Sequence, residues 1–128
     1  DHFYIKVPCT PAGLLAARRL EQEGIPVNCT LGFSARQNYL IAAVAHTAFV
    51  NVFLGRLNAF VADNDLGTGE MVGERAALAS HRCMMALRSD GRTPTRQIAA
   101  SMREGSQVLS LAGVDVLPMP LKVVWSFE

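Results

Sequence analysis

Short apolar, β-branched runs alternate along the chain with longer segments in which apolar residues recur at helical spacing. The short runs are typical of buried strands, and the three- and four-residue spacing is typical of helices packed on one face. The predicted strands cover 4–10, 26–31, 48–53, 95–102 and 114–120, and the predicted helices cover 11–23, 34–45, 71–88 and 106–112. The polar, glycine-containing segment 58–69 is predicted to be a surface loop or short helix, and 121–128 to begin another helix.

Local signals mark the ends of the first two helices. Thr10 followed by Pro11 indicates an N-cap with proline at the first helical position. Ser34 followed three residues later by Gln37 indicates a capping box. Gly24 is expected to end the first helix in the left-handed conformation. These signals support the alternation of strand and helix independently of the apolar pattern.

Strand and helix alternating at this spacing predict parallel βαβ units in one domain, 1–128. Five strands and four helices fit either a small doubly wound sheet or the second half of a (β/α)8 barrel, which usually needs about 250 residues. Two features favour the half barrel. The pattern begins on a strand and stops on the start of a helix, so both ends look severed, and no Gly-x-Gly-x-x-Gly turn follows any strand.

Lys6 is the single cation in the apolar run 4–10, near the C-terminal end of a strand that we expect to be buried. In α/β proteins that end of a strand is where chemistry takes place. A lysine stripped of water there can lose its proton and attack a carbonyl, forming a Schiff base. The alternative interpretation is an ordinary surface lysine on a strand edge.

Polar groups also mark the ends of the next three predicted strands. These residues are Asn28 with Thr30, Asn51 with Arg56, and Ser101 with Arg103. Because parallel strands end at the same edge of a sheet, we expect all of them on one rim with Lys6. Hydroxyl and amide groups there would orient water and sugar hydroxyls, and the guanidinium groups would clamp a phosphate. Taken singly, each arginine is equally a solvated surface charge, and Thr30 a residue chosen for β-propensity.

Composition narrows the classes of function. The net charge of +1, with 18% charged residues and no lysine/arginine block, argues against a nucleic-acid binder. Three cysteines without Cys-x-x-Cys spacing argue against a disulfide framework or zinc site, and favour reduced thiols in a cytoplasmic protein. The apolar run 39–54 is interrupted by His46, Thr47 and Asn51, which favours a buried helix and strand over a membrane span. No signal-peptide pattern is present in the sequence.

Four stretches of the chain match, in order, the motifs of one known family. KVPCTPAG (6–13) resembles its Lys-[Ile/Leu/Val]-x-x-Thr-x-x-Gly strand, and NCTL (28–31), with Phe33-Ser34 behind it, resembles Asn-x-Thr-Leu-x-Phe-Ser. VFLGRL (52–57) resembles Pro-Phe-Val-Gly-Arg-[Ile/Leu]. ASMR (100–103), followed by LAGVD (111–115), resembles Ala-Ser-Phe-Arg followed by Leu-Ala-Gly-x-Asp. By these motifs nearly the whole chain resembles transaldolase and the related fructose-6-phosphate aldolases.

The resemblance implies a (β/α)8 barrel of which this chain supplies strands four to eight. It implies that Lys6 forms the Schiff base with the ketose donor, and that Asn28 and Thr30 position the catalytic water and the intermediate's hydroxyls. Arg56 and Arg103, helped by Ser101, would hold the sugar phosphate. Family members move a dihydroxyacetone unit from a ketose phosphate to an aldose phosphate in the non-oxidative pentose phosphate pathway. The resemblance implies sugar-phosphate substrates and neither a cofactor nor a metal.

Several departures from the family pattern keep alternatives open. Asn51-Val52 replaces a serine and proline and could change the phosphate contact, Ala12 stands where glutamate is frequent, and Met102 replaces an aromatic residue. The family's acid/base aspartate on the first strand and glutamate on the third are not in this chain. We therefore expect a homo-oligomer or pairing with a missing N-terminal half, and little turnover alone. The alternatives are a non-catalytic sugar-phosphate-binding or interaction module, a fructose-6-phosphate aldolase-type lyase, and a doubly wound domain with a structural Lys6.

Overall fold

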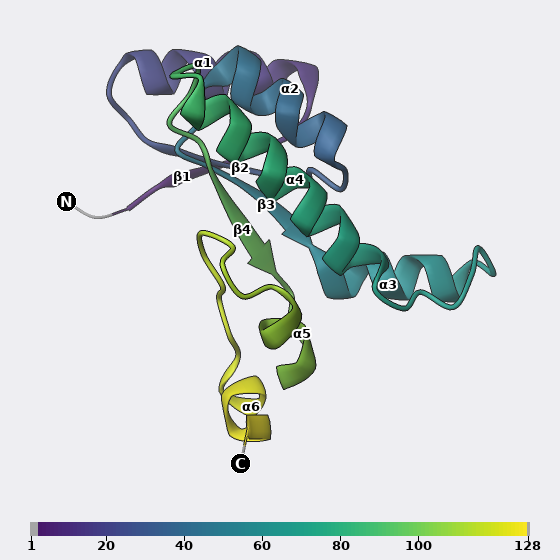
Figure 1. Ribbon diagram of the computed structural model, residues 1–128. Coiled ribbons are helices and arrows are strands. Elements are labelled where there is room, and N and C mark those ends of the chain that lie inside the picture. Colours follow the sequence, from purple (N-terminus) through teal and green to yellow (C-terminus); the bar gives the residue numbers. More distant parts are fainter. Residues whose placement is uncertain (1–2, 128) are drawn as a thin grey trace.

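Four parallel strands form one sheet in the order in which they occur along the chain (Figure 1). The computed structural model describes residues 3–127. The strands are β1 (Ile5–Pro8), β2 (Val27–Thr30), β3 (Phe49–Phe53) and β4 (Arg96–Ala100). The connecting helices are α1 (Pro11–Gln22), α2 (Ala35–Ala45), α3 (Leu54–Asp63) and α4 (Val72–Ser89). The predicted alternation of strand and helix in a parallel sheet is therefore confirmed.

Helices α1, α2 and α4 cover one face of the sheet (Figure 1). The strand residues that face these helices are apolar and buried: Val7, Val27, Cys29, Val50, Val52 and Ala99. Each fully buried valine or larger apolar side chain contributes roughly 1.5–3 kcal/mol to folding. Because side chains alternate along a strand, the opposite face carries Lys6, Asn28, Thr30, Asn51 and Phe53. We call this second surface the polar face.

The predicted N-caps are confirmed. Thr10 Oγ1 accepts a hydrogen bond from the Gly13 N–H at 3.0 Å, and Pro11 is the first residue of α1. Ser34 Oγ accepts the Gln37 N–H at 3.2 Å at the start of α2, but the Gln37 side chain accepts the Phe33 N–H at 2.9 Å, so the reciprocal bond of the predicted capping box does not form. Gly24 has a φ of +78°, so it turns the chain after α1 as expected.

Helix α3 is the first difference from the sequence prediction: a surface loop or short helix was predicted over 58–69, and the helix covers Leu54–Asp63. Gly55 and Arg56 were expected at the end of a strand, but they lie in the first turn of a ten-residue helix that follows β3 directly. No side chain caps this helix, and glycine and asparagine in its first turns are weak helix formers, so no local signal announces it. Packing against α4 stabilises it instead. A Cβ on Gly73 of α4 would lie 2.4 Å from Leu54 Cα, so the two helices touch closely at this point.

The predicted fifth strand, 114–120, is the second difference. This segment makes only one parallel bridge, between Val116 and Ile98 of β4. The Val116 N–H donates to the Gln97 carbonyl at 3.1 Å, and the Ala99 N–H donates to the Val116 carbonyl at 3.0 Å. Pro118 and Pro120 have no N–H to continue the ladder, which explains why the pairing ends after one residue.

The C-terminal part contains three short helical elements. These are α5 (Gly105–Ser110), α6 (Leu121–Val124) and the 3-10 helix η1 (Trp125–Phe127). The expected helix start at 121 is confirmed, and Glu128 lies outside the described residues. Within 3–127, no helix is both long and apolar enough to cross a membrane.

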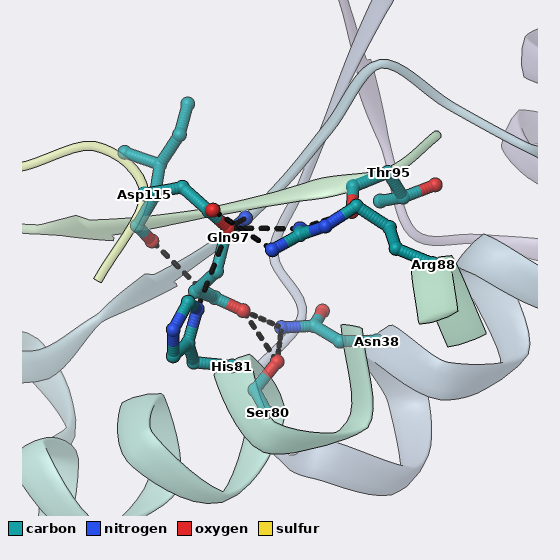
Figure 2. A network of polar contacts seen from close by, with 8 residues as sticks. Asn38, Ser80, His81, Arg88, Thr95, Gln97 and Asp115 are labelled. Atoms are coloured by element: carbon teal, nitrogen blue, oxygen red, sulfur yellow. Dashed lines mark hydrogen bonds and ion pairs between the residues drawn. The ribbon is translucent and has the colours of Figure 1, made fainter. Parts of the chain in front are cut away.

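A buried polar network joins α2, α4 and β4 (Figure 2). Asn38 Nδ2 donates to Ser80 Oγ at 2.8 Å, and Ser80 Oγ donates in turn to Gln97 Oε1. All three side chains are fully buried, so this network fixes how the two helices sit on the fourth strand.

The same figure shows Asp115 against the other side of Gln97 (Figure 2). Asp115 accepts the Gln97 N–H at 2.8 Å and a bidentate pair from Arg88 at 2.9 and 3.0 Å, and His81 Nδ1 lies 3.4 Å away. Burial acts to raise the pKa of Asp115, but the Gln97 N–H, Arg88 and His81 together outweigh it and lower that pKa below its ordinary value. Asp115 thereby anchors the segment that follows α5 to β4.

Candidate functional site on the polar face

Three polar side chains of β2 and β3 form a continuous hydrogen-bonded row on the polar face. Asn51 Nδ2 donates to Asn28 Oδ1 at 2.7 Å, and Asn51 Oδ1 accepts from Thr30 Oγ1 at 3.1 Å. Asn51 is only 2% exposed. Both ends of its amide are thus used internally, and this fixes the positions of Asn28 and Thr30. The structure brings together three of the residues that the sequence proposed for the site.

Lys6 and Arg56 meet on one aromatic ring. Lys6 Nζ lies 5.3 Å from the centroid of the Phe53 ring, and Arg56 Cζ lies 4.7 Å from the same centroid. Both distances are within the range of cation–π attraction. Because Phe53 is the last residue of β3, this contact places the lysine of β1 and the arginine of α3 at the same end of the polar face.

The prediction that Lys6 lies on a buried strand is wrong. Only Val7 of β1 is buried, and Lys6 is exposed. Two physical reasons account for this. Within residues 3–127, β1 has a strand neighbour on one side only, and no helix covers the polar face on which Lys6 lies (Figure 1). The lysine nevertheless lies beside Asn28, its partner in the register of β1 and β2.

Ser101 and Arg103 turn away from the tip of β4 toward α3. Ser101 has a φ of +66°, which bends the chain immediately after the strand. Arg103 then lies against Gly55, where an added Cβ would be 3.0 Å from Arg103 Nε and 2.3 Å from the Ser101 carbonyl oxygen. A glycine is required at this position, because any side chain would separate α3 from the arginine.

The two arginines line different cavities. Arg103 borders a cavity of about 510 Å³ between α3, the start of α4 and α5. Arg56 borders an apolar cavity of about 350 Å³ with Phe33, Leu57 and Phe60. Arg56 belongs to the first turn of α3, and Arg103 packs against the same turn at Gly55. That they clamp a single phosphate stays a prediction.

Sequence reasoning missed three residues beside Arg103. Glu74, at the start of α4, is 2% exposed and accepts hydrogen bonds from Asn58 of α3 and Gln107 of α5. One feature of the sequence indicates that Glu74 is buried and bonded. Glu74 shares a helix face with Ala77 and Leu78, at spacings of three and four residues, and a charge on an apolar face needs buried partners.

Cysteines and metal-ligating side chains are the remaining groups to place in the described part of the chain. All three cysteines are free. Burial, and then the neighbouring Cys9, raise the pKa of the Cys29 thiol to about 12, and burial also raises the pKa of Cys9. Among residues 3–127, no three His, Cys, Asp or Glu side chains gather in a way that could hold a metal ion.

The fold and the site together define a class of protein. A parallel α/β sheet carries a lysine and a row of amide and hydroxyl groups on one face, and two arginines lie beyond the C-terminal ends of β3 and β4, one in α3 and one in the segment before α5. This is the arrangement of an α/β protein with its site at the strand ends.

Comparison with known proteins gives the family. Residues 1–128 match the Transaldolase/Fructose-6-phosphate aldolase family. A "Probable transaldolase" of Kosmotoga olearia is 36% identical over 126 residues, which are 97% of this chain and 51% of that protein. The "Probable transaldolase" of Desulfatibacillum aliphaticivorans is 38% identical over 122 residues, 94% of this chain and 50% of the relative. The "Probable transaldolase" of Thermus thermophilus is 37% identical over 118 residues, which are 91% of this chain and 47% of the relative.

The chain therefore belongs to the transaldolase/fructose-6-phosphate aldolase family. It spans about half the length of the curated relatives that it matches.

Proposed function

We propose that this chain carries the Schiff-base and phosphate-binding half of a transaldolase-type aldol site. The observation that carries the proposal is the meeting of Lys6 and Arg56 on the Phe53 ring, on the same face as the row formed by Asn28, Asn51 and Thr30. In the proposed barrel β1 to β4 are strands four to seven, and the bridge at Val116 is the remnant of strand eight. The polar face is then the barrel interior.

In the proposed reaction the unprotonated Lys6 amine attacks the carbonyl carbon of a ketose phosphate. A C–N bond forms, and loss of water gives the iminium. A general base takes the proton of the β-hydroxyl, and cleavage of the Cα–Cβ bond of the iminium releases an aldose phosphate and leaves the electron pair on the lysine-bound fragment as an enamine. The enamine then attacks an acceptor aldehyde, and hydrolysis of the new iminium frees the lysine.

The side chains around Lys6 have separate roles in this scheme. Asn28 and Thr30, held by Asn51, position the water and the hydroxyls of the bound intermediate. Arg56 and Arg103, with Ser101, hold the phosphate at the far end of the sugar. The general acid/base would come from the family's first and third strands, which this chain does not contain. The whole protein would act in the pentose phosphate pathway of the cytoplasm as a transferase.

Borohydride trapping tests this function directly. The chain has two lysines, Lys6 and Lys122. We expect incubation with fructose 6-phosphate and borohydride to leave a covalent adduct that peptide mass spectrometry maps to Lys6. Lys6→Met should abolish the adduct, and the matched control Lys122→Met, on exposed α6, should keep it. A folded wild-type sample without an adduct, or an adduct on Lys122 alone, would contradict the proposal.

A second candidate is a non-catalytic sugar-phosphate-binding module. It is favoured by two observations: Lys6 is exposed, and Asn51 turns its amide to Asn28 and Thr30 rather than outward. Phosphate binding without a Lys6 adduct would support this candidate. Repeated turnover that releases both glyceraldehyde 3-phosphate and free dihydroxyacetone without an acceptor would instead indicate a fructose-6-phosphate aldolase-type lyase.

A further inference from the structure

Glu74 is a buried carboxylate at the centre of the contact between α3, α4 and α5. Its two oxygens accept Asn58 Nδ2 at 3.2 and 3.0 Å, and Oε1 also accepts Gln107 Nε2. Asn58 Oδ1 accepts the Gly73 N–H at 2.6 Å, so its amide is used at both ends. A buried charge costs free energy unless such bonds compensate it, and the network around Glu74 supplies them.

Gln107 connects Glu74 to the backbone of Arg103 through hydrogen bonds. Its Nε2 donates to Glu74, while its Oε1 accepts the Arg103 N–H at 2.7 Å. The same oxygen also takes part in the capping box of α5, where it receives the Glu104 N–H at 3.4 Å. Gln107 is 5% exposed. The position of the Arg103 backbone is therefore set by a glutamine that is itself held by Glu74.

The other end of the network reaches the element that carries Arg56. Asn58 lies two residues after Arg56 in α3, and the first turn of this helix packs against Arg103 through Gly55. Glu74, Asn58 and Arg103 all line the cavity of about 510 Å³. Figure 1 shows α3 and the start of α4 beyond the C-terminal end of β3. One buried carboxylate thus ties together the two segments that carry the arginines.

We propose that Glu74 is a positioning residue for the phosphate clamp: through Asn58 and Gln107 it sets where Arg56 and Arg103 stand relative to each other. This inference rests on the proposed function of the two arginines. It concerns a residue that touches neither the substrate nor the lysine.

The sign of its effect separates positioning from plain electrostatics. A carboxylate near a phosphate site repels the anion. If this repulsion were the only effect of Glu74, removing its charge would tighten phosphate binding. If Glu74 positions the arginines, removing its charge should weaken phosphate binding, because the second oxygen acceptor is lost and Gln107 is released.

The experiment compares Glu74→Gln with the matched control Glu70→Gln in the full chain. Glu70 lines the same cavity but is exposed, so both variants remove one charge from the same place. Binding of inorganic phosphate is measured by calorimetry, and exchange of the Arg103 amide hydrogen by NMR. We expect Glu74→Gln to weaken phosphate binding by about tenfold and to speed exchange of that amide, in line with the cost of misplacing a binding group. Glu70→Gln should leave the amide unchanged and bind phosphate equally or more tightly.

A polarity swap guards against misfolding as the cause. In the double variant Glu74→Gln with Gln107→Glu, the amide and the carboxylate exchange places, so the bond between them and the acceptor for the Arg103 N–H are both retained. This variant should recover most of the phosphate affinity and the slow exchange. Phosphate binding by Glu74→Gln equal to or tighter than wild type, unchanged Arg103 exchange, or failure of the swap to recover either property would overturn the inference.

These outcomes are distinct from failure of the proposed function. Borohydride trapping on Lys6 tests the Schiff base with unphosphorylated dihydroxyacetone, and it should proceed equally in wild type and Glu74→Gln. Absence of a Lys6 adduct would remove the aldol function but leave the phosphate and exchange results to decide the role of Glu74. If the wild type binds no phosphate and Arg103→Ala leaves that result unchanged, both the phosphate clamp and the positioning role of Glu74 are contradicted.

Discussion

Asp115 shows how much a single side chain fixes at the N-terminal end of β4. It accepts a backbone N–H from β4 and a bidentate guanidinium from α4, and it lies 3.4 Å from His81 (Figure 2). Its side chain is 17% exposed, so these bonds are screened less than surface pairs. The residue sits at the end of the family-like LAGVD stretch, and its role in the structure is to hold that stretch to the sheet.

The lowered pKa of Asp115 predicts an acid-sensitive contribution to stability. Because the folded state binds fewer protons than the unfolded state, the contribution is fully present above the ordinary value of 3.8. It is lost as the pH falls through the lower pKa of the folded state. Asp115→Asn should cost roughly 1–3 kcal/mol at pH 7, because charged hydrogen bonds to Arg88 are lost.

Urea unfolding of wild type and Asp115→Asn between pH 7 and pH 2 measures this. The difference between the two should shrink as the pH falls below about 4. A difference that stays constant across this range would show that the charge of Asp115 contributes nothing.

At the scale of elements, one glutamate joins the beginnings of two strands to a helix. Glu21 of α1 accepts the Val27 N–H and the Ala48 N–H, each at 2.7 Å, through the same oxygen. Val27 starts β2, and Ala48 precedes β3. The contact therefore sets how α1 sits against the N-terminal ends of both strands, opposite the end that carries the site.

Glu21→Ala is expected to lower the free energy of unfolding by roughly 1–3 kcal/mol, since two partly buried backbone donors lose a charged acceptor. Glu23→Ala is the matched control. Glu23 lies two residues after Glu21, and its side chain makes an exposed ion pair with Arg19, four residues before it, so its loss should cost at most about 1 kcal/mol. Chemical denaturation of the two variants compares them, and equal losses would show that the Glu21 contacts carry no special weight.

At the scale of the whole molecule, the sheet has one covered and one uncovered face. Tyr4 and Ile5 at β1, and Leu121 and Trp125 near the C-terminal end, are exposed apolar side chains. β1 also has an unpaired edge within this sheet. Exposed apolar surface and free strand edges favour association, so we propose that this chain pairs with a second copy or with an N-terminal half of the family barrel.

Sedimentation velocity tests this association. The chain alone should sediment as more than a monomer, and Ile5→Lys, at the β1 edge, should reduce its association. Leu15→Lys, which changes an exposed leucine on α1, should leave it unchanged. Adding the N-terminal half of the Kosmotoga olearia relative should shift the distribution to a mixed complex. A stable wild-type monomer that ignores the added half would contradict the proposal.

The sequence by itself determined the order of the four parallel strands with α1, α2 and α4 between them, the N-caps of α1 and α2, and the family. These features depend on local chemistry: apolar periodicity, cap residues and short motifs are written in neighbouring residues. It also placed Asn28 and Thr30 on the face opposite Cys29, because alternation along a strand needs no tertiary information.

Only the tertiary structure decided the rest. Whether Lys6 is buried depends on which elements cover β1, and the existence of α3 depends on its packing against α4. The length of the pairing at Val116 depends on its neighbour in the sheet. The link from Glu74 through Gln107 to Arg103 joins α4 to α5 and to the segment before α5, and Glu74 and Gln107 are 33 positions apart in sequence. Such contacts join segments that are far apart in sequence, so no local sequence pattern predicts them. They nevertheless set the geometry of the site.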